Sequence, residues 1–346
     1  MMLKNFKKFT FRALFVGNIL VILLMLLIGN IDWLNPVDYP LLANLGLGYP
    51  ILLVFNFAFL VFWAFVRLRT IWLPVLGFIL CFASIRIYCP FNLPKDKPHG
   101  AIKVLSYNVY MFDSWEETNP KTNPIVNYII DSKADLVCLQ EAQGDGDKSG
   151  GIYKRLKAHY PYFKLMVKKK PGADYMVLLS RYPILWQDTI PYGSSSNQSV
   201  AYIVDIKGTK TLVVNNHFES NGLSNDDKAG FKSLVKGRMR TNKAKSESVH
   251  LLRKLGKVSM RRAPQADMVA RYVKQYLDKK VPVILCGDFN DNPLSYTHRV
   301  IDKELIDCFV ASGNGPGISY HRSGMYFRID HIFCSDDFEP YDAHVD

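Results

Sequence analysis

Apolar residues dominate the first ninety positions of the chain, whereas the remainder alternates short apolar and polar stretches. Three long apolar runs lie at about residues 11–31, 41–66 and 71–87. Each comes close to the roughly 20 residues that a helix needs to cross a bilayer. Three such runs with few charges favour spanning helices over buried core helices, and the first run lacks the small-residue cleavage site of a signal peptide. We therefore predict a three-span membrane anchor over residues 1–90.

The charges that flank these runs predict the orientation of the anchor. Basic residues precede or open the first span and fill the loop before the third span, whereas the loop after the first span contains two acidic residues: Lys4, Lys7, Lys8, Arg12, Arg67 and Arg69 against Asp32 and Asp38. Because basic loops remain in the cytoplasm, the N-terminus is expected there. Three spans in the cytoplasmic membrane then place the rest of the chain on the extracytoplasmic side, which is the periplasm in a bacterium with two membranes.

Residues 91–100 read as a short, stiff, proline-containing linker, and residues 101–346 read as one mixed domain. Hairpin-like strand pairs alternate with helical patterns, which predicts a layered α/β (α+β) domain. The predicted strands are Ile102–Tyr107, Leu136–Gln140, Tyr175–Leu179, Ala201–Ile206, Thr211–Asn215 and Val281–Cys286, and the predicted helices are Ile125–Asp131, Tyr153–Ala158 and Ala266–Asp278.

The formal net charge of +12 favours an anionic partner, and many of the basic residues gather in an insertion at residues 219–262. This insertion is either a solvated, partly helical surface or a lobe that grips phosphates or anionic lipid. No aromatic residue lies between Leu234 and Met260, which weakens the case for stacking on single-stranded bases. The six cysteines show no metal-binding spacing and read as small core residues.

Four polar motifs each follow an apolar strand, and a fifth places an acid inside one. They are Ser106-Tyr107-Asn108, Leu139-Gln140-Glu141, Asn215-Asn216-His217, Gly287-Asp288-Phe289-Asn290 and Arg328-Ile329-Asp330-His331-Ile332. Ligand-binding and catalytic groups commonly emerge where strands leave a core. Each motif alone is as readily a turn or a solvated strand end, so the prediction of a site rests on all five in this order.

Together the motif side chains offer oxygen ligands for a hard cation. Glu141 and Asp288 supply carboxylates, and Asn108 and Asn290 supply amide oxygens, which suits Mg²⁺ better than a soft metal. A metal with a few polar groups can offset phosphoryl charge and assist an attacking water and a leaving oxygen. The pattern therefore predicts phosphoester hydrolysis.

From about Ile102 onward, these five motifs resemble those of the endonuclease/exonuclease/phosphatase superfamily. Its members include DNase I-like nucleases, abasic-site endonucleases, inositol polyphosphate phosphatases and bacterial sphingomyelinases. The resemblance implies a four-layered fold in which two mainly antiparallel sheets pack face to face, flanked by helices, with the motifs converging at one end. It implies a magnesium cofactor, with Mn²⁺ as an alternative, but it does not select a substrate.

The resemblance also implies roles for individual residues. Glu141 would be the principal metal ligand, with Asn108 beside it. Asp288 would orient or activate the attacking water, and Asn290 would contact the scissile phosphate.

Three further residues receive roles in the same way. His217 would bind the phosphate or assist the leaving oxygen. Asp330 would pair with a catalytic histidine. Tyr175 lies near another phosphate-contacting position of relatives, although the glycine usual in that strand is not evident here.

The chain departs from the family pattern after Asp330. Relatives continue to a Ser-Asp-His motif whose histidine is the partner of that carboxylate, and the sequence to Asp346 contains no such motif. His331 would face the opposite side of its strand, and His344 lacks the motif context. Either the polypeptide is incomplete or catalysis has been lost, and in both cases little hydrolytic activity is expected of these 346 residues.

The leading prediction is thus a membrane-anchored, magnesium-dependent phosphodiesterase, with a nuclease-like activity favoured. A lipid or sugar phosphatase is the alternative within the same class, so the substrate is a nucleic acid, a phospholipid headgroup or a phosphorylated sugar. A membrane-tethered module that binds anionic ligands without turnover is the alternative from another class.

Overall fold

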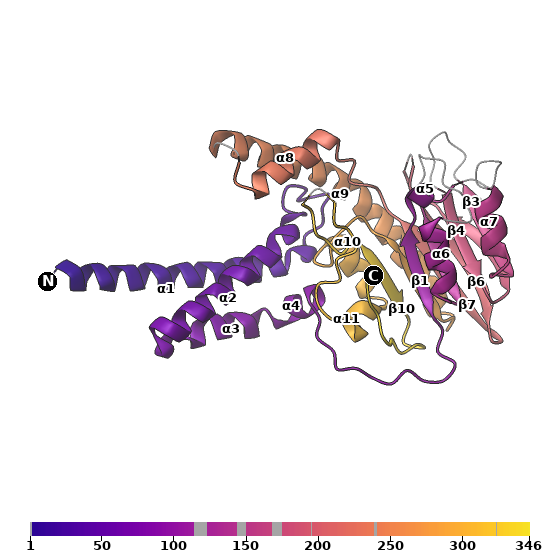
Figure 1. The fold of residues 1–346 in the computed structure, drawn as a ribbon, viewed down its shortest axis with the longest axis horizontal. Coiled ribbons are helices and arrows are strands. Elements are labelled where there is room, and N and C mark those ends of the chain that lie inside the picture. The colour runs from indigo at the N-terminus through magenta and orange to yellow at the C-terminus, as the bar shows by residue number, and fades with distance from the viewer. Residues whose placement is uncertain are drawn as a thin grey trace.

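A computed structural model describes residues 2–113, 123–143, 150–167, 175–194, 196–238, 241–322 and 324–346. In Figure 1, the N-terminal helices project from one side of a mixed domain built around two sheets. Arg240, one of the basic residues of the predicted insertion, lies outside the described residues.

The N-terminal region consists of four helices joined by short 3₁₀ turns. Two helical segments of the described chain, Lys8–Trp33 and Leu45–Val66, are long and apolar enough to cross a membrane. Leu68–Leu80 and Phe82–Tyr88 form a pair bent by 63°, which gives a third span if the pair counts as one. The elements are α1 (Met2–Gly29), η1 (Ile31–Trp33), η2 (Leu45–Gly48), α2 (Tyr49–Val66), η3 (Leu68–Thr70), α3 (Trp72–Leu80) and α4 (Phe82–Tyr88).

The domain contains a four-stranded sheet of order β1-β2-β4-β3 and a six-stranded sheet of order β5-β6-β7-β8-β10-β9. Each sheet has a single parallel pair, β1 with β2 and β7 with β8, and is otherwise antiparallel across the described strands. The strands are β1 (Val104–Asn108), β2 (Leu136–Gln140), β3 (Tyr162–Val167), β4 (Tyr175–Ser180), β5 (Ile184–Ile190), β6 (Gln198–Ile206), β7 (Thr209–His217), β8 (Val283–Asp288), β9 (Ile306–Asp307) and β10 (Asp330–Cys334).

Alternating side chains build the layers. In β2, Leu136 and Cys138 face the core between the two sheets, whereas Val137 and Leu139 face the outer helices. Because successive side chains of a strand point to opposite faces, a strand buried on both sides reads as one continuous apolar run. This explains why the sequence marks β2 so clearly.

Helices cover the outer face of each sheet and complete the predicted four layers. Helices α6 and α7 pack on the smaller sheet, and α9 and α10 pack on the larger one. The domain helices and turns are α5 (Tyr110–Asp113), α6 (Pro124–Asp131), α7 (Gly150–Lys157), α8 (Asn225–Val235), α9 (Thr241–Leu277), α10 (Tyr296–Asp302) and α11 (Cys308–Ser312). The predicted α/β (α+β) class and DNase I-like layering are confirmed.

The helix predicted at Ala266–Asp278 is only the last part of α9, which begins at Thr241. The earlier turns of α9 are basic and do not cover the sheet core, so their apolar residues give no clear core-facing stripe. Together with α8 they form a projecting hairpin, which we call the α8–α9 hairpin and define as residues 225–238 and 241–260.

The anchor region packs directly on the domain. Asn44 Nδ2 donates to Ser259 Oγ at 3.0 Å, and Asp32 lies 3.7 Å from Arg299. A Cβ on Gly256 would lie 2.4 Å from the carbonyl oxygen of Pro40, so only glycine permits this approach. These contacts fix the domain against the helix ends near residues 30–48.

Candidate functional site

The ends of five strands meet at one edge of the two-sheet core. In the smaller sheet, Asn108 at the end of β1 pairs with Gln140, immediately before Glu141. In the larger sheet, Asp288 at the end of β8 pairs with both His217 and Asp330. Parallel pairing of β1 with β2 and of β7 with β8 brings their carboxyl ends to the same edge.

Four predicted site residues are in close contact across the two sheets. Asn108 Nδ2 donates to Asp288 Oδ2 at 3.0 Å, which joins the end of β1 to the end of β8. His217 Nε2 lies 3.6 Å from Glu141 Oε1 and 3.9 Å from Asp288 Oδ2. The arrangement places one imidazole between two carboxylates, a geometry suited to holding an anionic group together with a cation.

The turn after β8 fixes the neighbouring groups. Asp288 Oδ1 accepts from the backbone N–H of Asn290 at 2.7 Å, and Asn290 Nδ2 donates to the carbonyl of Phe218 at 3.1 Å. Gly287 has φ +141°, and a Cβ there would lie 1.9 Å from the Asn216 carbonyl oxygen. The glycine of the Gly-Asp-Phe-Asn motif is therefore required by close backbone approach.

Asp330 faces the site from the start of β10. Ser319 Oγ accepts from the backbone N–H of Asp330, and the side-chain oxygen Oδ1 of Asp330 has no hydrogen-bond partner among the described residues. Burial, followed by the negative charge of Asp288, raises the pKa of Asp330 to about 8. This unpartnered, buried oxygen lies near the carboxylates of Asp288 and Glu141, so the group of three acids lacks a compensating positive charge.

Tyr175 does not join this group. Its side chain packs against the cluster between the smaller sheet and α6–α7, on the outer face of β4. Its carbonyl accepts from the backbone N–H of Ala142, directly after Glu141. The residue thus supports the strand end that carries Glu141, and its predicted phosphate contact stays a prediction.

The two histidines near the end of the chain lie away from Asp330. His331 is buried on the opposite face of β10, where its Nε2 lies 3.2 Å from the carbonyl oxygen of Asp291. His344 is exposed, and its Nδ1 lies 2.9 Å from the carbonyl oxygen of Asp342. Neither contact brings a histidine to the Asp330 carboxyl group.

Sequence reasoning missed a buried amide pair beneath the site. Gln140 Nε2 donates to Asn215 Oδ1 at 2.7 Å, and Asn215 Nδ2 donates to the carbonyl oxygens of Leu139 and Val177. These bonds clamp the two sheets together just below Glu141 and His217. The sequence does carry a signal for this pair, because an amide inside an apolar strand is costly unless it is hydrogen-bonded.

One basic residue at the end of the predicted insertion is structural. Arg262 is fully buried, its Nη1 lies 3.0 Å from Asp291 Oδ2, and its Nη2 donates to Asn221 Oδ1 at 2.7 Å. It therefore braces the loop that follows Asn290. The sequence pattern could not separate this buried arginine from the exposed charges before it.

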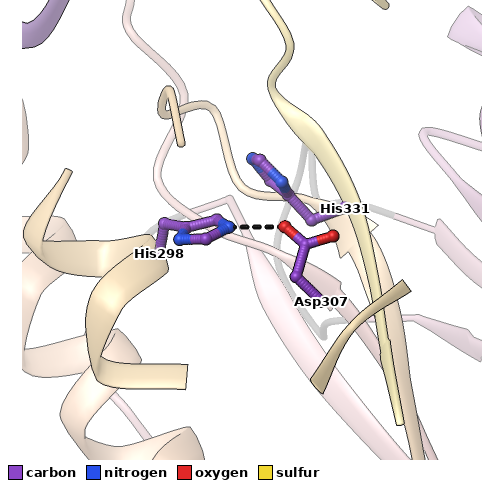
Figure 2. A group of neighbouring side chains, drawn as sticks. All are labelled: His298, Asp307 and His331. Carbon is purple, nitrogen blue, oxygen red and sulfur yellow. Dashed lines mark hydrogen bonds and ion pairs between the residues drawn. The ribbon is translucent and has the colours of Figure 1, made fainter. Parts of the chain in front are cut away.

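A separate cluster lies behind the larger sheet, formed by His298, Asp307 and His331 (Figure 2). Among the described residues it is the single group of three or more histidine, cysteine or acidic side chains close enough to share a metal ion, with ligand atoms within 4.8 Å of one another. However, His298 Nε2 already lies 2.8 Å from Asp307 Oδ2, and Asp307 Oδ1 accepts from the N–H groups of Phe309 and Val310.

The charges around this cluster also fit a structure that needs no ion. Burial raises the pKa of Asp307, but the His298 contact and the positive charge of Arg328 outweigh it, so the net pKa is lowered. Burial holds the pKa of His331 well below its ordinary value. The negative charge of Asp307 is offset by the positive charge of Arg328, and His331 is neutral. The cluster can therefore support β10 without a metal ion.

Glu141, Asn108 and their neighbours have the chemistry to hold magnesium. Their donors are hard oxygens, and Glu141 remains about one-third exposed, whereas Asp288 is buried. The unpartnered oxygen and raised pKa of Asp330 show an excess of negative charge that a divalent cation would offset. These residues therefore fit the Mg²⁺ ion that the sequence predicted.

Comparison with known proteins supports the fold. The profile described as "Endonuclease/Exonuclease/phosphatase family" matches residues 105–346, and a profile for a domain of unknown function matches residues 11–88. No curated protein matches the chain.

Similar solved structures include a truncated TDP2 from Caenorhabditis elegans, which is 14% identical, with 69% of this chain and 85% of that chain covered and a TM-score of 0.47. The human Nocturnin catalytic domain is 15% identical, with 68% and 83% covered and a TM-score of 0.47. A mannosyl-6-phosphatase from Bacteroides thetaiotaomicron is 17% identical, with 68% and 86% covered and a TM-score of 0.42.

Proposed function

The chain belongs to the endonuclease/exonuclease/phosphatase family, and from this premise we propose that it is a membrane-anchored, magnesium-dependent phosphoesterase. The observation that carries the proposal is the contact of Asn108, Glu141, His217 and Asp288 across the meeting ends of two sheets. The two long apolar N-terminal helical segments support the anchor.

In this proposal Glu141, with Asn108, holds the metal ion. A bound magnesium ion supplies positive charge that stabilises the phosphoryl oxygens. Asp288 orients the attacking water and accepts its proton, since both of its oxygens are fixed by the Asn108 and Asn290 donors.

Asn290 and His217 contact the phosphate. One N–H of the Asn290 amide is used by the Phe218 carbonyl, which leaves the second to donate to a phosphate oxygen. His217 lies between Glu141 and Asp288 and can donate to the phosphate or to the leaving oxygen.

General acid–base assistance at Asp330 is the catalytic contribution that the site supports least. In the described residues neither His331 nor His344 reaches its carboxyl group. Single-turnover conditions with enzyme in excess are therefore the suitable assay.

The test uses the full chain in detergent with Mg²⁺ and the water-soluble diester bis(4-nitrophenyl) phosphate. We expect hydrolysis that is lost in Glu141→Gln and is abolished by EDTA. Asp188→Asn, at an exposed position on β5, is the matched control and should retain activity. Equal hydrolysis by Glu141→Gln and the unsubstituted chain would show that the assigned site is wrong.

A further inference from the structure

One continuous cavity of about 2060 Å³ connects the candidate site with the ends of the anchor helices. Its lining includes Glu141 and Asp288 of the candidate site as well as Ile28, Leu47 and Ile51. These three apolar residues belong to the end of α1, to η2 and to the start of α2. The volume exceeds the roughly 300–1,000 Å³ of an ordinary small-molecule pocket.

The α8–α9 hairpin forms part of the wall of this cavity. Phe231 and Leu234 line it from α8, and Leu251, Leu252 and Leu255 line it from α9. Residues three or four apart on a helix share one face, so each helix presents an apolar face to the cavity. The face that the hairpin presents to the cavity is thus largely apolar.

The same hairpin is basic on its outer surface. Lys228 lines the cavity, and the exposed positive residues of the hairpin include Lys232, Lys236, Arg238, Lys243, Lys245, Arg253 and Lys257. Figure 1 shows the hairpin projecting from the domain on the same side as α1–α4. An apolar wall with a positive rim beside a membrane complements an amphipathic molecule with an anionic head.

Nucleic acid fits this arrangement poorly. A nucleic-acid groove combines positive charge with aromatic stacking platforms or donors to base edges. Here the residues that line the groove from the hairpin are mostly aliphatic, and its charged residues other than Lys228 are mainly exposed to solvent. The α8–α9 hairpin therefore presents a mainly apolar face to the cavity and a basic surface to solvent.

Building on the proposed function, we propose that the substrate is a lipid phosphoester taken from the adjacent membrane leaflet. Its acyl chain lies between the α8–α9 hairpin and the anchor residues Leu47 and Ile51, and its phosphate reaches Glu141 and Asp288. In the reaction, a water oxygen forms the new bond to phosphorus and the bond to the leaving oxygen breaks. The water proton accepted by Asp288 is returned to solvent, and the leaving oxygen takes up a proton.

Photocrosslinking of the full chain in phosphatidylcholine nanodiscs tests the groove. The probe is a phosphatidic acid analogue with a diazirine on one acyl chain, and mass spectrometry locates the labelled residues. We expect labelling of the hairpin face at Phe231, Leu251 and Leu255, suppressed by excess unlabelled phosphatidic acid but not by diacylglycerol. Labelling confined to the lipid-facing sides of the spans, or equal suppression by diacylglycerol, would overturn the proposal.

Variants that place a carboxylate in the groove provide a second test of the proposal. Leu255→Asp on the hairpin and Leu47→Asp on the opposite wall should each abolish hairpin labelling, and the second leaves the hairpin's own packing untouched. Val249→Asp is the matched control, because Val249 is 36% exposed and does not line the cavity. Unchanged labelling in a folded Leu47→Asp variant would contradict the proposal.

Hydrolysis of bis(4-nitrophenyl) phosphate in parallel separates the two proposals. If the groove variants hydrolyse this soluble diester like the unsubstituted chain but lose labelling, the groove and the phosphoesterase both stand. If the soluble diester is hydrolysed but the hairpin is never labelled, the lipid groove alone is wrong. If the hairpin is labelled but no hydrolysis depends on Glu141, the phosphoesterase assignment alone is wrong.

Discussion

The two faces of β10 place two adjacent residues, Asp330 and His331, in different surroundings. Asp330 points into the candidate site, where its Oδ1 lacks a partner among the described residues and its pKa is raised to about 8 by burial and by Asp288. His331 points to the other face, among Phe289, Phe333 and His298, in a cluster in which Asp307 is fully hydrogen-bonded.

The difference separates residues that serve chemistry from residues that serve stability. Unsatisfied, like-charged groups destabilise a fold and persist where a ligand will offset them. Paired, buried groups hold elements together without a ligand. Substitutions on the site face should therefore lower activity without destabilising the fold, and removal of a paired group on the cluster face should lower stability without lowering activity.

The largest effect is expected for Asp288→Asn on the site face. Loss of the proton acceptor should lower single-turnover hydrolysis by about 10²–10⁴-fold. The melting temperature should stay the same or rise, because one of several crowded carboxylates becomes neutral. Hydrolysis and melting measured on the same preparation check this, and a destabilised variant with normal activity would reverse the assignment of faces.

The next effect is expected for Asp307→Ala on the cluster face. It removes the carboxylate of the buried His298 pair and the negative charge nearest to Arg328, which should cost about 3–5 kcal/mol of unfolding free energy. Because the pKa of Asp307 is lowered in the folded state, its contribution is present above the ordinary carboxyl pKa of 3.8 and is lost as the pH falls below that value.

Acid unfolding of the unsubstituted chain and the variant measures this prediction. The stability difference between them should shrink as the pH falls below the ordinary carboxyl range. A difference that stays constant down to strong acid would mean that Asp307 is not ionised in the folded protein.

A smaller effect of opposite sign is expected for Asp330→Asn. The pKa of about 8 means that the folded state keeps a proton that the unfolded chain releases near the ordinary value of 3.8. The stabilisation from that proton is complete below the unfolded pKa and is lost as the pH rises through about 8. At higher pH, without magnesium, the variant should be more stable by about 1–3 kcal/mol.

Thermal unfolding in EDTA from mildly acidic to alkaline pH checks the Asp330 prediction. The two melting curves should converge in acid and separate in base. A variant that is less stable at alkaline pH would show that the carboxylate has a partner in the folded protein.

The smallest effect is expected for His331→Phe. The ring would pack among Phe289 and Phe333, and losing the Asp291 contact would be offset by removing the unpartnered Nδ1, so unfolding free energy should change by less than about 1.5 kcal/mol. Metal analysis of the purified chain complements the melting curve. A bound transition metal that this variant loses, with a large drop in stability, would show that the cluster is a metal site.

Much of this arrangement can be predicted from the sequence because strand ends are marked locally. Each apolar run stops at its polar motif, and the resemblance of these motifs to those of the family implies that Asn108, Glu141, His217 and Asp288 meet at one end. The fold class follows from the same runs. The Gln140–Asn215 clamp and the His298–Asp307 contact cannot be predicted in this way, since each depends on which strands and helices meet in space.

The α8–α9 hairpin shows a second limit of sequence reasoning. Its charge pattern indicates an anionic partner. The surface that its apolar residues face depends on how the anchor packs on α9, where Pro40 lies against Gly256 and Asn44 contacts Ser259. Length and hydropathy predict the spans, whereas they do not predict the bend between α3 and α4. The side of the membrane on which the domain lies stays a prediction.

Calorimetric titration of Mg²⁺ into the full chain in detergent tests the central claim most directly, because it reports the site independently of turnover. Three proteins are compared: the unsubstituted chain, Glu141→Gln on the site face, and His331→Phe on the opposite face. The account predicts magnesium binding by the first and third and its loss in Glu141→Gln. Equal binding by Glu141→Gln, or loss of binding in a folded His331→Phe variant, would contradict it.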